Sequence, residues 1–332
     1  MNRISAITCA VAVALACQGG IKHLGDPVSS CGTDTRLKVV VTTFPLYDWT
    51  RQILGDRLAA AELVLLQQSG VDLHSYSPTA ADLRKIAACD LFVFVGGESD
   101  EWTERALAQG GNPRRRALNL IKTLGSAAKT EKVVEGMEHE HHHDHAEKHG
   151  HDGSQEADEH VWLSLRHASA LVKKIAADMA ALDPANAVTY RSNAAMYCGR
   201  LDALDKAYAA TVAAAKRKTL LVADRFPFRY LADDYGLEYF AAFSGCSAES
   251  EASFKTIAFL AKKVDELDLP VILTIEGAKH KIAETVKRTA KDRNRRILAL
   301  DSLQSISGAA IKTTRYVDVM ERNLEVLKAA LN

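Results

Sequence analysis

The amino-acid sequence predicts an α/β protein made of two lobes with mainly parallel sheets, joined by one long helix. Short runs rich in Val, Ile, Leu and Phe alternate with helical patterns in both halves of the 332-residue chain. This alternation is the order that parallel sheets with covering helices require. Between the halves lies an Ala-rich stretch at residues 184–218. A continuous helix of about 30 residues there would be about 45 Å long.

The bulk composition is typical of a globular protein. The chain is 47% hydrophobic and 25% charged, unlike disordered or membrane-spanning chains. Its 42 Lys and Arg residues equal its 42 Asp and Glu residues, so no overall field attracts nucleic acid or anionic lipid. We therefore expect no nucleic-acid partner. No C-x-x-C pair occurs among the cysteines beyond residue 17, and their disulfide pairing stays open: Cys31, Cys89, Cys198 and Cys246.

The first 17 residues are predicted to be an export signal that does not belong to the fold. Arg3 precedes an apolar run at residues 4–16, which is too short to span a bilayer as a stable helix. The run ends in Ala-Leu-Ala-Cys, which fits either an ordinary signal-peptidase site or a lipoprotein signal. We favour the second interpretation and expect an exported protein, periplasmic or on the outer surface, anchored to a membrane through lipidated Cys17. A polar lead-in follows at residues 18–36.

The first lobe is expected to cover residues 37–183. Apolar runs predict three strands, at 37–44, 61–66 and 90–97. Helices are predicted at 45–56 and 79–88, the second opened by Thr79 and Asp82 with capping-box spacing. A further helix carries one apolar face, formed by Ala168, Leu171, Val172, Ile175, Met179 and Leu182.

The connecting helix and the second lobe complete the chain. Pro184 suits the first turn of the helix predicted at 184–218, and Asp183 suits its N-cap. The second lobe is expected to cover residues 219–332 and to close with a helix at 313–331. Its strands are predicted at 219–224, 237–243, 270–276 and 295–300.

Side chains that commonly ligate metals follow the predicted strands. They are His74, Glu98, Asp224, Glu276 and Asp301. In Rossmann-like lobes, ligands bind at the carboxyl ends of parallel strands. Each residue alone is compatible with a cap or a solvated surface, and the recurrence favours a ligand site.

A His-rich segment at residues 138–153 holds seven of the twelve histidines: His139, His141, His142, His143, His145, His149 and His151. The letters at 139–143 fit the H-E-x-x-H pattern of metalloproteases, but that pattern needs a helix with an apolar face, and the flanks here are charged. We therefore predict a disordered loop at 135–158 that acts as an accessory metal chelator. Ordering a free loop costs conformational entropy, so its sites should be weaker than a preformed one.

Several motifs occur in an order typical of one known family: "TTFPLYDWTRQILGD", "GVDLHSYSPTAADL", "DLFVFVGGESDEW", "DEHVWLS" and "YLADDYGL". With them, the chain resembles the metal-specific solute-binding proteins of zinc and manganese ABC importers (cluster A-I) from about Leu37 to the C-terminus. The His-rich loop is similar to that of the zinc-uptake members. The resemblance implies two lobes joined by a stiff helix, with a metal held between them by four side chains.

Carried over by position, the resemblance implies that His74 and His160 are the first two ligands and Asp301 the fourth. The third position holds His or Glu in the family and falls on Arg225 here, and a guanidinium cannot bind a divalent cation. We take Asp224 as the replacement.

Other replacements for the third ligand stay open. They are a water molecule, the His-rich loop, or the thiolate of Cys246. Arg225 itself is expected to pair with Asp224 or Glu276.

The resemblance implies a protein that captures Zn²⁺ outside the cytoplasm and delivers it to the membrane permease and ATPase of an ABC importer. Two imidazoles with carboxylates suit Zn²⁺. A Mn²⁺ or iron site is the alternative, and it is less favoured because those ions prefer more oxygen ligands. We expect a monomer and no enzymatic activity. A surface adhesin or zinc buffer is a second alternative, and a zinc hydrolase with Glu276 or Asp224 as base is a less favoured third.

Overall fold

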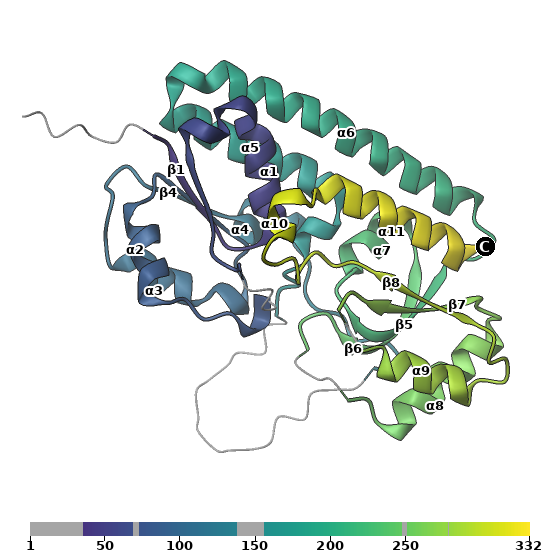
Figure 1. Ribbon diagram of the computed structural model, residues 1–332. Coiled ribbons are helices and arrows are strands. Elements are labelled where there is room, and N and C mark those ends of the chain that lie inside the picture. Colours follow the sequence, from purple (N-terminus) through teal and green to yellow (C-terminus); the bar gives the residue numbers. More distant parts are fainter. Residues whose placement is uncertain (1–35, 69–72, 138–155, 248–250, 278) are drawn as a thin grey trace, which may run out of the picture. The chain divides into compact units, whose positions relative to one another are not determined.

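The computed structural model describes residues 36–68, 73–137, 156–247, 251–277 and 279–332. Residues from Arg36 to Asn332 form one compact unit, with two four-stranded sheets in which every strand pair is parallel (Figure 1). We call the parts built on these sheets the first and second lobes. The predicted export signal, Cys17, Cys31 and the seven histidines of the His-rich segment lie outside the described residues. In the described part of the chain, none of the helices has the length and hydrophobicity needed to cross a membrane.

The first sheet has the strand order β2-β1-β3-β4. Its strands are β1 (Lys38–Val41), β2 (Glu62–Leu65), β3 (Leu91–Phe94) and β4 (Arg116–Asn119). The helices of this lobe are α1 (Phe44–Leu54), α2 (Ala80–Ala88), α3 (Trp102–Ala108) and α4 (Leu120–Leu124). The three predicted strands are present but shorter, and β4 was not predicted.

Local sequence signals explain how two helices of the first lobe begin and end. Pro45 lies in the first turn of α1, and the helix ends before Gly55, whose φ of 51° is a conformation that glycine adopts readily. The predicted capping box of α2 is confirmed. The Thr79 side chain accepts a hydrogen bond from the Asp82 amide at 3.2 Å, and the Asp82 carboxylate accepts one from the Thr79 amide at 3.1 Å.

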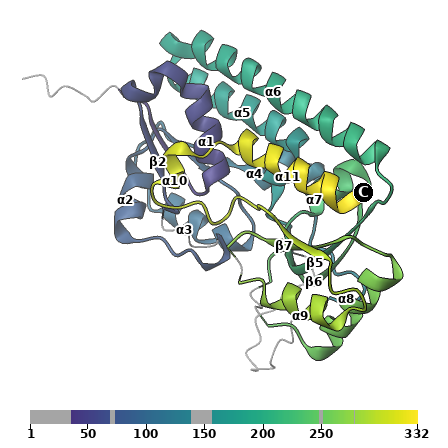
Figure 2. The same ribbon diagram turned by 45° about the vertical axis from the view of Figure 1, so that its right-hand side comes forward.

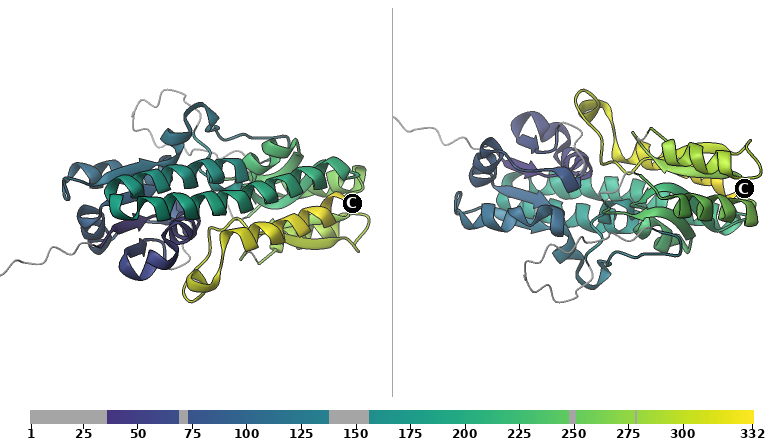
Figure 3. Two further views of the ribbon diagram at one scale, coloured as in Figure 1. Left: turned by 90° about the horizontal axis from the view of Figure 1, so that it is seen from above. Right: turned by 90° about the horizontal axis from the view of Figure 1, so that it is seen from below.

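Two long helices, α5 (Leu165–Leu182) and α6 (Ala187–Ala214), pack against each other (Figure 2). The predicted apolar face of α5 is confirmed, since all its members are buried except half-buried Leu182. In Figure 3, α6 extends along both lobes, and it packs on α1 and α5 of the first and on α7 and α11 of the second.

The connecting helix differs from its prediction at both ends. A 3₁₀ turn covers Pro184–Asn186, and α6 ends at Ala214 because Ala215 is extended, with a ψ of 145°. Asp183 precedes the turn but its side chain does not cap a backbone amide there. Its carboxylate accepts hydrogen bonds from Asn186 Nδ2 and Tyr190 Oη instead, each at 2.7 Å.

The second sheet has the strand order β6-β5-β7-β8. Its strands are β5 (Thr219–Phe226), β6 (Glu238–Ser244), β7 (Val271–Ile275) and β8 (Arg296–Leu300). Its helices are α7 (Arg229–Tyr235), α8 (Phe254–Glu266), α9 (Lys281–Thr289), α10 (Ala310–Thr313) and α11 (Tyr316–Leu331). All four predicted strands are confirmed. However, β5 continues past a register shift between Val222 and Arg225, so Asp224 lies inside the strand and not after it.

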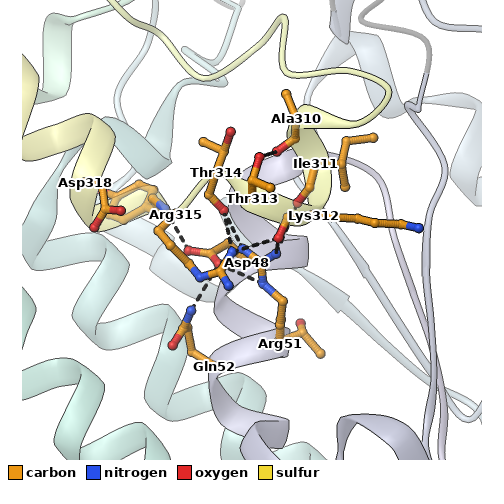
Figure 4. Close-up of polar contacts among 12 residues, drawn as sticks. Asp48, Arg51, Gln52, Ala310, Ile311, Lys312, Thr313, Thr314, Arg315 and Asp318 are labelled. Atoms are coloured by element: carbon orange, nitrogen blue, oxygen red, sulfur yellow. Dashed lines mark hydrogen bonds and ion pairs between the residues drawn. The ribbon is translucent and has the colours of Figure 1, made fainter.

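A buried ion pair joins the first helix to the C-terminal segment (Figure 4). Asp48 and Arg51 of α1 pair with each other, and their side chains are 0% and 8% exposed. The Arg51 guanidinium donates to the carbonyl oxygens of Ile311 and Lys312, at 3.1 and 3.0 Å. The Asp48 carboxylate accepts from the Tyr316 amide at 2.7 Å. This group, which we call the Asp48–Arg51 clamp, fixes α10 and the start of α11 against α1.

Candidate metal centre

The first predicted ligand, His74, lies on a short 3₁₀ helix, Leu73–Ser75, in the connection between β2 and α2. Its Nδ1 is 2.8 Å from Ser99 Oγ and 3.5 Å from Glu159 Oε2. The side chain is 13% exposed. Two polar partners at one ring nitrogen therefore set the orientation of this imidazole.

The second predicted ligand, His160, is fully buried at the start of the 3₁₀ helix Val161–Leu163. Asp158 Oδ1 lies 2.9 Å from its Nδ1 and also accepts a hydrogen bond from the His160 amide at 3.0 Å. In the neutral imidazole, a carboxylate at Nδ1 favours the tautomer with the proton on that atom, which leaves the lone pair of Nε2 available. That Nε2 is buried and has no hydrogen-bond partner among the described residues.

The structure brings a thiol to the two imidazoles. Cys246 lies in the turn after β6, and one ligand atom each from His74, His160 and Cys246 lie within 4.8 Å of one another. The two imidazole centroids are 5.4 Å apart. With Zn–N bonds of about 2.0–2.1 Å and a Zn–S bond of about 2.3 Å, a small contraction of this group would place all three atoms around one Zn²⁺ ion. We call these three residues the His–His–Cys cluster.

A glycine permits the close approach between the second lobe and His160. A Cβ added to Gly245 would lie 3.1 Å from two ring atoms of His160 and 3.0 Å from the carbonyl oxygen of Phe226. Because such contacts are too tight for a side chain without movement of its neighbours, Gly245 allows the Cys246 turn to pack directly on the imidazole.

Buried carboxylates surround the cluster. Glu131, Asp158 and His160 form a second group of mutually close ligand atoms, and Glu131 accepts a hydrogen bond from the Gly245 amide at 3.3 Å. Burial raises the pKa of Glu159 to about 7, and burial together with the Asp158 charge raises the pKa of Glu131. A cation placed here would lower these pKa values by stabilising the ionised carboxylates.

The predicted carboxylate ligands have other contacts. Asp224 accepts hydrogen bonds from Thr274 Oγ1 and from the Arg225 amide, each at 2.9 Å. Asp301 accepts from the Leu303 amide at 2.8 Å, and burial, reinforced by the Glu276 charge, raises its pKa to about 6. Among the residues that the structure describes, neither carboxylate belongs to a group of mutually close ligand atoms.

Arg225, at the altered ligand position, lies against the Cys246 turn. Its guanidinium donates to the carbonyl oxygen of Ser247 at 3.4 Å. The sequence predicts pairing of this side chain with Asp224 or Glu276. The contact with Ser247 was not predicted.

Glu131 and Asp158 were also missed as members of the site. The sequence does contain a signal for Asp158, because it lies two residues before His160 in "DEHVW". The role of Glu131 depends on tertiary packing and has no local signal.

Comparison with known proteins places the chain in one family. The sequence description of the family "Zinc-uptake complex component A periplasmic" (ZnuA) matches residues 39–330. The zinc-binding lipoprotein AdcA of Streptococcus pneumoniae is 34% identical over 295 residues, which are 89% of this chain and 56% of AdcA. The high-affinity zinc uptake system protein ZnuA of Bacillus subtilis is 32% identical over 315 residues, covering 92% and 93% of the two chains. This chain thus spans about half the length of its AdcA relatives and nearly all of the Bacillus protein.

Solved structures agree with these sequence matches. The Zn(II)-bound ZnuA-like domain of Streptococcus pneumoniae AdcA is 30% identical, with a TM-score of 0.68 over 89% of this chain and 99% of that domain. The metal-dependent lipoprotein YcdH of Bacillus subtilis is 30% identical, with a TM-score of 0.71 and the same coverage. On these matches, the chain belongs to the ZnuA family of periplasmic zinc-uptake components.

Proposed function

We propose that this protein captures Zn²⁺ outside the cytoplasm at the His–His–Cys cluster and delivers it to the permease of an ABC importer driven by an ATPase. The observation that carries the proposal is the buried Nε2 of His160. This atom has no hydrogen-bond partner among the described residues, and a buried lone pair left without a partner is unfavourable unless a ligand binds it.

The choice of Zn²⁺ rests on the chemistry of the cluster and on the relatives. Imidazole ligands suit Zn²⁺, whereas Mn²⁺ favours carboxylate, carbonyl and water oxygens. The relatives AdcA and ZnuA are named for zinc binding and zinc uptake. Both lines of support favour Zn²⁺ over the manganese or iron alternative.

We propose His74 and His160 as the ligands from the first lobe and Asp301 as a carboxylate ligand from the second. Trp162 Nε1 donates to the carbonyl oxygen of Ser302 at 2.9 Å, which ties the segment after His160 to the segment after Asp301. A small movement between the lobes would then bring the Asp301 carboxylate to the metal or remove it. Asp224, which is bonded to Thr274, is the weaker candidate.

Export, lipidation and the accessory loop complete the proposal. We propose that the first 17 residues direct export and that Cys17 carries the lipid anchor of a monomeric protein. One AdcA relative is named a lipoprotein, which supports this anchoring. The seven histidines of the segment at 138–153 would collect metal weakly and raise its concentration near the cluster.

Metal binding by purified full-length protein tests the proposal. We expect one tight equivalent of Zn²⁺ by competition with a chelator, and its loss in the double variant His74→Ala/His160→Ala. The matched control is His280→Ala, since His280 contacts Thr274 and lies outside the cluster. Retention of the tight equivalent by the double variant would refute the site. Transport is tested by deleting the gene, which should abolish growth under zinc limitation and be rescued by added Zn²⁺.

A further inference from the structure

The proposed site lacks the third ligand that the family pattern supplies. The family resemblance implies His or Glu at the position that Arg225 occupies here. A guanidinium has no lone pair to offer a cation, and two imidazoles alone leave half of a four-coordinate zinc site unfilled. Another group must therefore complete the coordination of the metal in this protein.

Cys246 is placed to supply that ligand. Its Sγ is within 4.8 Å of a ring nitrogen of His74 and of His160, and it comes from the lobe opposite to both. His160 is fully buried, and its Nε2 has no hydrogen-bond partner among the described residues. A nearby thiol and a buried ring nitrogen without a described partner thus occur at the same histidine.

The other described cysteines show what a structural thiol looks like in this protein. Cys89 and Cys198 are 1% and 3% exposed in apolar clusters. Their thiols donate to the carbonyl oxygens of Ile86 and Ser169, at 3.2 and 3.4 Å. Cys246 instead lies close to two imidazoles, and the amide of the preceding Gly245 donates to the carboxylate of Glu131 at 3.3 Å. Its surroundings resemble a ligand set and not a hydrophobic core.

We propose that Cys246 is the third metal ligand of this protein, bound as a thiolate, and that Arg225 lies against its turn in place of a ligating residue. The inference rests on the proposed function, because it completes the same site. The sulfur–metal bond forms as the thiol loses its proton to solvent or to a neighbouring carboxylate. A soft thiolate favours Zn²⁺ and Cd²⁺ and contributes little to Mn²⁺ binding, so Cys246 would set the metal selectivity of the site.

Cobalt substitution of the full chain tests the inference. At one equivalent of Co²⁺ or less, we expect a near-ultraviolet thiolate-to-cobalt charge-transfer band in the unchanged protein. The band should be absent from Cys246→Ser and retained in the matched control Cys198→Ser. In chelator competition, Cys246→Ser should bind Zn²⁺ about 100-fold more weakly or worse, since even outer-shell changes lose about 10- to 100-fold. Its Mn²⁺ affinity should change by no more than about threefold.

Restoring the residue type of the family provides a second readout. Arg225→His in the Cys246→Ser background should recover Zn²⁺ affinity at least about tenfold, because an imidazole at position 225 would then bind the metal. The charge-transfer band should not return, because no sulfur is bound. Failure to recover would overturn the claim that Cys246 has replaced position 225.

The outcomes separate the two proposals. Unchanged Zn²⁺ affinity and an unchanged cobalt spectrum in Cys246→Ser would overturn the thiolate ligand while leaving a site built on the histidines. Absence of any tight equivalent in the unchanged protein would overturn the proposed function as well. If Cys246→Ser does not fold, alkylation of the Cys246 peptide in the unchanged protein, followed by mass spectrometry, replaces it. One equivalent of Zn²⁺ should slow that alkylation at least about tenfold, and no slowing would reject the ligand.

Discussion

Two buried polar groups lie where the first and second lobes meet, and they differ in how their hydrogen bonds are satisfied. In the Asp48–Arg51 clamp, charged atoms of both residues bond to each other, to backbone carbonyls or to a backbone amide. In the His–His–Cys cluster, the buried Nε2 of His160 has no such partner among the described residues. The satisfied hydrogen bonds of the first group are typical of a structural contact. The unpartnered nitrogen of the second group is typical of a ligand-binding site.

The difference predicts which changes affect folding and which affect binding. Breaking a satisfied buried ion pair leaves an uncompensated charge and should lower the free energy of unfolding. Removing an imidazole from the cluster should lower metal affinity and have a smaller effect on the fold. The following changes, from the largest expected effect to the smallest, test this separation.

Arg51→Ala should lower the free energy of unfolding by about 3–5 kcal/mol, because Asp48 then stays buried without its countercharge. Denaturant titration in the presence of a chelator measures this change. Zinc affinity of the folded fraction should stay within about threefold of the unchanged protein, because the partners described for the clamp lie on α1, on α10 and at the start of α11. An affinity loss as large as that of a cluster variant would show that the two groups are not separable.

His160→Ala should weaken Zn²⁺ binding by about 2.5–4 kcal/mol, or about 70- to 900-fold. The estimate divides the binding free energy of a four-ligand structural zinc site, about 10–16 kcal/mol, among its ligands. Isothermal titration with a competing chelator measures it. The unfolding midpoint of the metal-free variant should move less than that of Arg51→Ala, and the reverse order would contradict the comparison.

Asp158→Asn should weaken Zn²⁺ binding by about 10- to 100-fold, since its carboxylate orients His160 and holds the proton on Nδ1. Asn keeps an acceptor oxygen but removes the charge. Asp183→Asn, at a carboxylate far from the cluster that binds Tyr190, is the matched control and should leave zinc affinity unchanged. Equal affinities for both variants would remove Asp158 from the site.

Deletion of residues 138–153 should have the smallest effect on tight binding. The weak extra equivalents of Zn²⁺ should disappear, and the one tight equivalent should keep its affinity within about threefold, because His74 and His160 are unchanged in this variant. Titration of both proteins by inductively coupled plasma mass spectrometry after dialysis gives the stoichiometry. Loss of the tight equivalent would place the main site in the loop.

The fold was predictable where its determinants are local. The capping box at Thr79 and Asp82 and the apolar face of α5 need only short-range patterns, and both are confirmed. The four-residue strand β4 was missed because it begins with Arg116 and has no apolar run. Asp224 was predicted at the end of its strand because the apolar residues stop at Ala223, whereas pairing with β6 continues to Phe226.

The site was predictable only in part, because only some of its residues lie in local sequence motifs. His74 and His160 lie in motifs that can be recognised from the sequence alone, and the structure brings their rings together. Cys246 remained one of several alternatives, because its position depends on how closely the turn at Gly245 packs on His160. Such a contact between residues about 85 positions apart in the sequence leaves no local pattern.

X-ray absorption at the zinc edge tests the central claim most directly. Full-length protein loaded with one equivalent of Zn²⁺ should show a first shell that contains imidazole nitrogens at about 2.0–2.1 Å together with one sulfur at about 2.3 Å. A shell of nitrogen and oxygen alone would contradict the thiolate from the second lobe, and a shell without imidazole would contradict the whole site.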